Sequence, residues 1–132
     1  MKFMLMMNAT RGTGDWNVFK WKPEEFKAHV GYMHAINKDL RAAGELVAAE
    51  GLAAPGQARI VRADKKGAPE ITDGPFAETK EFLAGYWIVD VENKERAYAI
   101  AARVSLAPGP GGAPLYIPVE VREVMGAAPT DV

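Results

Sequence analysis

The chain has 132 residues, of which 48% are hydrophobic and 25% charged, a length and composition typical of one globular domain. Its formal net charge of -1 gives no electrostatic reason to expect nucleic acid as a partner, because nucleic-acid-binding proteins usually carry a basic excess or patch. The sequence has no cysteine and no apolar run near the roughly 20 residues of a membrane helix, so we expect a cytoplasmic protein without disulfides, cysteine nucleophiles or a membrane partner.

Hydrophobic pattern and turn residues predict five strands and two helices. In chain order these are a strand at 3–8, a helix at 23–43, strands at 45–52, 59–64 and 84–91, a helix at 93–105 and a strand at 115–124. Pro23 suits a first helical position, Gly44 a helix end and Asn93 an N-cap. The stretch DKKGAPEIT predicts a hairpin-like connection with a further short strand near Glu70, and residues 125–132 are expected to form a loose tail.

Each predicted helix has one apolar face. On the first helix this face is expected to contain Phe26, Val30, Met33, Ile36 and Leu40. On the second helix the corresponding residues are Ala97, Ile100, Ala101 and Val104. Apart from one additional strand, the element order is β-α-β-β-α-β, which predicts an α+β, ferredoxin-like fold over residues 1–124, in which two helices cover one face of an antiparallel sheet.

The strand sequences FMLMM and GYWIV are apolar at successive positions, whereas a sheet covered on one face should alternate between apolar and polar residues. The second face of the sheet therefore needs a cover. The remaining loops are short, so we predict a homodimer joined sheet to sheet. The alternative is a monomer in which the aromatic loop at residues 16–21 covers this face.

The stretch TDGPF, which begins at Thr72, is the first candidate for chemistry. Asp73 could act as a general acid or base beside a cleft, Gly74 would let a ligand approach closely, and Phe76 could fold inward. The alternative is structural, because Asp and Gly are ordinary turn residues that bond their own loop.

Both histidines, His29 and His34, lie on the first predicted helix. His34, Asn37 and Arg41 are spaced to form a polar stripe along one helix edge. Since histidine transfers protons near neutral pH, His34 paired with Asp73 is the catalytic hypothesis, with an ordinary wet helix edge as the alternative. His29 falls on the apolar face and is expected to be a core-edge histidine. A spacing of five residues does not place the two histidines on one helix face, so we predict no metal site.

The stretch DGPFAETKE, preceded by DLRAAGELVAAEGL and followed at the end of the chain by VEVREV, resembles the DGPF group of the YCII-related proteins. The resemblance implies a dimeric α/β barrel of bacterial, cytoplasmic type. It also implies a site formed by a histidine and an aspartate, and Asp73 belongs to the signature itself. At least one member of that family is a ring-dehalogenating lyase that acts on hydroxyquinols.

Two functions follow from these observations. The first is a cofactor-free enzyme that performs acid–base, lyase-like chemistry on a small phenolic molecule, with Asp73 and His34 as proton carriers. Phe76, Tyr86 and Trp87 would form the apolar wall of its site. The second is a non-catalytic module that binds a small molecule or a partner and is accessory to transcriptional regulation.

Overall fold

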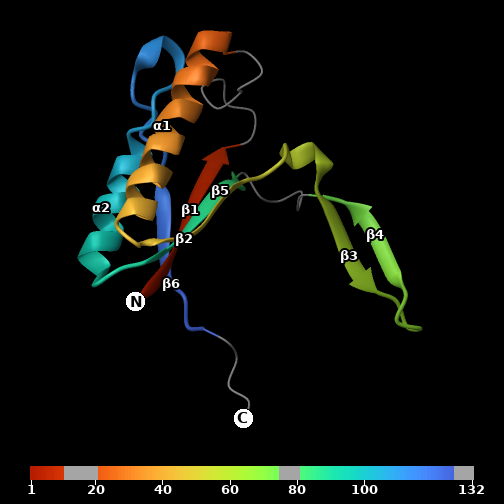
Figure 1. Cartoon of the computed structure of the whole chain (residues 1–132). Helices are drawn as coiled ribbons and strands as arrows, with labels where there is room; N and C mark the ends of the chain where they lie inside the picture. Colours follow the sequence, from red (N-terminus) through yellow and green to blue (C-terminus); the bar gives the residue numbers. More distant parts are fainter. Residues whose placement is uncertain (11–20, 75–80, 127–132) are drawn as a thin grey trace.

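The computed structural model describes residues 1–10, 21–74 and 81–126 of the chain. Four strands form one antiparallel sheet in the order β2-β5-β1-β6. Their bounds are Lys2–Thr10 for β1, Leu46–Gly51 for β2, Glu81–Asp90 for β5 and Val119–Glu123 for β6. Helices α1 (Pro23–Ala42) and α2 (Lys94–Ser105) lie together on one face of this sheet (Figure 1). The arrangement confirms the predicted α+β class and is compatible with a ferredoxin-like fold.

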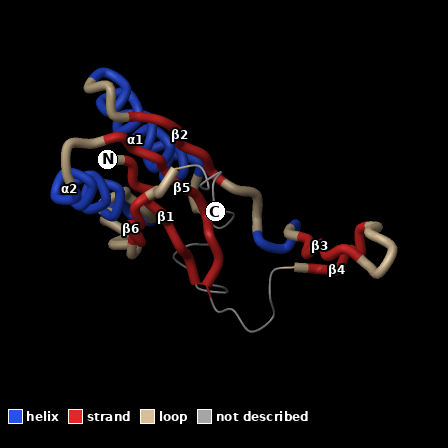
Figure 2. The backbone as a smooth tube through the Cα atoms, turned by 90° about the horizontal axis from the view of Figure 1, so that it is seen from below, coloured by secondary structure: helices blue, strands red, loops and turns tan. Residues whose placement is uncertain are grey.

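Strands β3 (Arg59–Ala63) and β4 (Pro69–Asp73) form a separate two-stranded sheet between β2 and β5 in the sequence. The predicted strand at 59–64 and the short strand near Glu70 therefore both exist, but they pair with each other and not with the main sheet. In two perpendicular views this hairpin lies on the side of the main sheet opposite the helices (Figures 1 and 2). We call the β3–β4 hairpin the arm.

The core lies between the main sheet and the two helices. Leu5 of β1 is paired with Trp87 of β5, and both side chains are buried against the helices. From the helices the buried residues are Ile36 and Leu40 on α1 and Ala97, Ile100, Ala101 and Val104 on α2. The predicted apolar face of α2 is thus confirmed in full.

Helix α1 begins at Pro23, as predicted, and the chain turns out of it at Gly44, whose φ of +73° is a conformation that glycine adopts without strain. One expectation for its apolar face was wrong, because Phe26 is exposed, whereas His29, which was also predicted on this face, is buried. No helix in the described part of the chain is long and apolar enough to cross a membrane.

The last strand is shorter than predicted. β6 begins at Val119, whereas the alternating pattern predicted a strand from Leu115. Tyr116 has a φ of +53°, outside the range of an extended strand, and Pro118 has no N–H to donate to a neighbouring strand. Leu115 instead donates its N–H to the carbonyl of Ala107, which closes the loop after α2.

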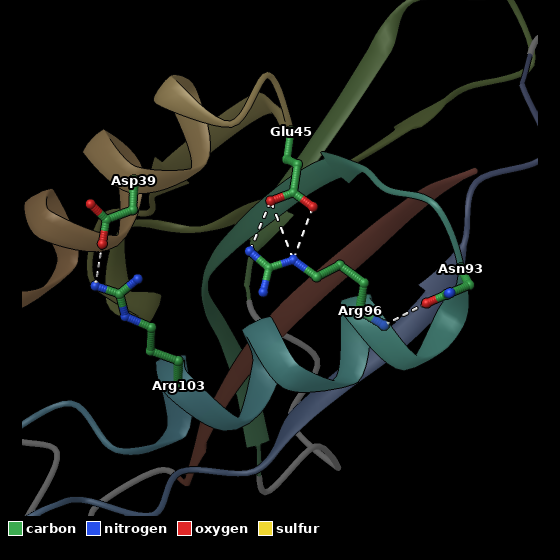
Figure 3. A network of polar contacts seen from close by, with 5 residues as sticks. All are labelled: Asp39, Glu45, Asn93, Arg96 and Arg103. Atoms are coloured by element: carbon green, nitrogen blue, oxygen red, sulfur yellow. Dashed lines mark hydrogen bonds and ion pairs between the residues drawn. The ribbon is translucent and has the colours of Figure 1, made fainter.

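A polar network fixes the ends of the helices above the sheet (Figure 3). The Arg96 guanidinium donates to both carboxylate oxygens of Glu45, with Nε–Oε2 at 2.9 Å and Nη2–Oε1 at 2.8 Å. These hydrogen bonds hold the pKa of Glu45 below its usual value. Asn93 caps α2 by accepting from the Arg96 N–H, and Arg103 pairs with Asp39 across the two helices. The start of β2 is thereby tied to the first turn of α2.

Candidate functional site

The sheet face away from the helices, which we call the open face, has an apolar centre and a charged rim. Side chains alternate along a strand, so Met6 and Tyr86 point away from the core that Leu5 and Trp87 enter. Strand register places two rows across this face. They are Glu50, Tyr86, Met6 and Glu120 in one row and Ala48, Ile88, Met4 and Arg122 in the other. The central side chains are half-buried and the flanking charged ones are exposed.

Asp73 lies at the base of the arm and is 94% exposed. Its Oδ1 is 3.6 Å from Nε of Arg59, the residue opposite it in the hairpin. Gly74 donates its N–H to the Ala58 carbonyl, and a Cβ at this position would meet Ala58 and Ile60 at 3.3 Å. The hydrogen bond from Gly74 to Ala58 closes the base of the arm. Phe76 lies outside the described residues.

The predicted polar stripe on α1 has an exposed part and a bound part. His34 and Arg41 are exposed, while Asn37 is half-buried and its Oδ1 accepts from the Trp87 Nε1–H at 2.8 Å. Trp87 is a buried core residue, whereas Tyr86 faces the open side of the sheet. The two neighbouring rings thus lie on opposite faces and do not form one apolar wall, because successive side chains of a strand alternate.

Within one chain the structure does not bring Asp73 and His34 together. His34 belongs to α1, which covers one face of the main sheet, and Asp73 belongs to the arm, which lies on the other side (Figures 1 and 2). A catalytic pair made of these two residues would require a second copy of the chain.

His29 is the buried titratable side chain of α1, with 7% of its surface exposed. Its Nδ1 lies 3.0 Å from the Pro108 carbonyl oxygen. A carbonyl only accepts hydrogen bonds, so Nδ1 carries the proton and the lone pair of the neutral ring is on Nε2. The ring also packs edge-on against Trp21, with centroids 5.3 Å apart and an angle of 78°. Burial lowers the pKa of His29, and the bond to Pro108 opposes this shift. His29 is therefore neutral at pH 7.

Two further hydrogen bonds tie α1 to the chain around Pro108, one to the loop that carries it and one to the end of α2 before that loop. Glu25 accepts a hydrogen bond from the Gly111 N–H, in the short helical turn Pro110–Gly112, and this bond lowers the pKa of Glu25. The Tyr32 hydroxyl donates to the Arg103 carbonyl near the end of α2, at 2.7 Å. These contacts hold the surroundings of His29 in place, and we treat His29, Trp21 and Pro108 as the candidate site.

The sequence places His29 at the edge of the core, and the structure agrees. The catalytic hypothesis drawn from the sequence, however, assigned proton transfer to His34. The signal in the sequence was the position of His29 one helical turn before Met33 on the apolar face. A buried histidine must have a partner for its ring nitrogens, and this partner comes from a loop 79 residues further along the chain. Among the described residues no group of three or more His, Cys, Asp and Glu is arranged to hold a metal ion.

A family model described as the YCII-related domain matches residues 1–123. No curated protein matches the chain.

Proposed function

Because the chain belongs to the YCII-related domain family, we propose that it is a cytoplasmic, homodimeric enzyme that performs cofactor-free acid–base chemistry on a small phenolic molecule. The observation that carries this proposal is the buried, neutral imidazole of His29. General acid–base catalysis needs a group whose pKa lies near the working pH, and a histidine with a lowered pKa is in its basic form at neutrality.

His29 is the better supported proton carrier of the two histidines. Its ring is oriented by the Pro108 carbonyl, in the manner of a catalytic histidine whose second nitrogen is held by a fixed acceptor. The Trp21 ring beside it supplies an aromatic surface of the kind that packs against a phenolic ring. Exposed His34 has neither feature.

The homodimer is supported by the open face. Apolar side chains at the centre of an exposed sheet, with charged side chains at its rim, resemble the core and rim of a protein interface. In such a dimer Asp73 and His34 could belong to one site only if they came from different chains. Their pairing therefore remains a proposal that depends on the dimer.

The test is hydrogen exchange in a bound ligand. Simple phenols and hydroxyquinols are first screened for thermal stabilisation of the protein, and transfer of solvent deuterium to ring carbons of the ligands that bind is then followed by NMR. His29→Asn keeps an N–H near the Pro108 carbonyl but removes the titrating ring. We expect this variant to bind the same ligands. Its rate of deuterium transfer to their ring carbons should fall about 100-fold or more, which is the usual contribution of a general base.

His34→Ala and Asp73→Asn are the matched controls. If exchange is undiminished in His29→Asn but lost in both of these variants, the pair predicted from the sequence is the catalytic one and the assignment to His29 is wrong.

A second candidate function is a non-catalytic module that binds a small molecule or a partner. It is favoured by the position of Asp73, which lies exposed beside Arg59 at the base of the arm and is not brought to His34 within one chain. Ligands that stabilise the wild-type protein without any measurable exchange would support this module and exclude the enzyme for those ligands.

A further inference from the structure

The arm exposes apolar side chains on both of its strands. Val61 and Ile71 are directly opposite each other in the hairpin and are 60% and 62% exposed. The next pair on the same face of the arm is Ala63 and Pro69, and both are exposed. We call these four residues the apolar face of the arm. It forms a continuous surface, because residues two positions apart on a strand lie on the same side.

The arm has no core of its own. In the part of the chain that the structure describes, neither β3 nor β4 packs extensively against the main sheet or a helix. A two-stranded hairpin is marginally stable in water unless it packs against something else. The apolar face of the arm therefore needs a partner surface.

The position of the arm indicates where that partner lies. The arm projects on the open side of the main sheet, so a molecule that covers the open face is placed beside the arm (Figures 1 and 2). The occupant proposed above for the open face is a second copy of the chain.

The size of the open face is compatible with a dimer interface. β1, β5, β2 and β6 have 9, 10, 6 and 5 residues, so the open face covers roughly 490 Å² in projection. Stable interfaces bury about 800 Å² of accessible surface on each partner. The open face is therefore comparable in size to one side of a stable interface, and contact with the arm would enlarge that interface.

We propose that the arm is a dimerisation element, whose apolar face packs against the second copy that covers the open face. This inference rests on the homodimer proposed above. Twofold symmetry makes the contact reciprocal, so each dimer contains two arms and eight apolar side chains from them.

The first experiment measures the dimer dissociation constant of the full chain by sedimentation. The double variant Val61→Thr, Ile71→Thr keeps the β-branched side chains that strands prefer but places hydroxyls in the proposed contact. We expect the dissociation constant to rise at least about tenfold, because burying a hydroxyl without a partner is costly. The control is Tyr98→Thr, which changes a 53% exposed side chain on α2 and should leave the constant unchanged.

The second experiment measures protection directly and does not depend on the double variant folding. The chain has no cysteine, so a single cysteine introduced by Ile71→Cys is the only thiol. We expect its reaction with a maleimide to slow at least fivefold when the protein is concentrated from the monomeric to the dimeric range. A cysteine introduced by Tyr98→Cys should react at the same rate at both concentrations.

The outcomes separate the two proposals. A wild-type chain that remains monomeric at high micromolar concentration refutes the homodimer and the arm contact with it. If the wild type forms a dimer, two results together refute the arm contact and leave the homodimer standing. These are an unchanged dissociation constant in the threonine double variant and no protection of the thiol introduced by Ile71→Cys.

Discussion

Replacing His29 by asparagine should remove a pH-dependent component of stability. The pKa of His29 is lowered by burial, so the unfolded chain binds a proton more readily than the folded chain. The imidazole therefore costs no stability above its unfolded pKa of 6.5, and it increasingly destabilises the fold as the pH falls from 6.5 through the folded pKa. For one proton the slope of unfolding free energy against pH reaches at most about 1.4 kcal/mol per pH unit.

The assay is urea unfolding between pH 5.5 and pH 8, followed by tryptophan fluorescence. Glu25 and Glu45 have lowered pKa values and stay ionised over this range, so their contribution is constant. We expect the unfolding free energy of the wild type to be level above pH 7 and to fall below pH 6.5. His29→Asn should lack this fall, and exposed His34→Asn should retain it. Equal pH profiles for the wild type and His29→Asn would refute the neutral, buried imidazole.

Three further substitutions test the packing, each by chemical denaturation at pH 7.5. Gly85→Ala should destabilise the protein by about 2–3 kcal/mol, because a Cβ there would lie 2.9 Å from the backbone carbonyl oxygen of Glu50; a loss below about 0.5 kcal/mol would contradict that contact. Asn37→Ala should cost about 1–2 kcal/mol by leaving the Trp87 indole N–H without its acceptor, and an unchanged midpoint would show that water replaces the amide. Asn93→Ala should cost about 1 kcal/mol through the lost cap of α2, whereas Asn93→Asp should be nearly neutral.

Local patterns in the sequence predicted most of the elements. Pro23 and Gly44 bound α1, and Asn93 caps α2, because these residues act through their own backbone and their nearest neighbours. The buried face of α2 followed from the helical spacing of its apolar residues alone. The alternation that predicted a strand from Leu115 failed at Tyr116, where the positive φ has no signal in the hydrophobic pattern.

The candidate site was predicted less well than the fold, because its residues meet through long-range contacts. His29 is paired with a carbonyl 79 residues away, and Asn37 with an indole 50 residues away. Spacing along a helix showed that His34, Asn37 and Arg41 share an edge, but it could not show that the described sheet separates His34 from Asp73.

The sequence by itself determined most of the helices and strands, and that the central strands are apolar on both sides, since these properties depend on residue order. Only the tertiary structure decided that β3 and β4 leave the main sheet as an arm and that His29 is bonded to the Pro108 carbonyl. Both outcomes depend on which distant segments pack together, and the free energy of that packing belongs to the whole chain and not to any local stretch of it.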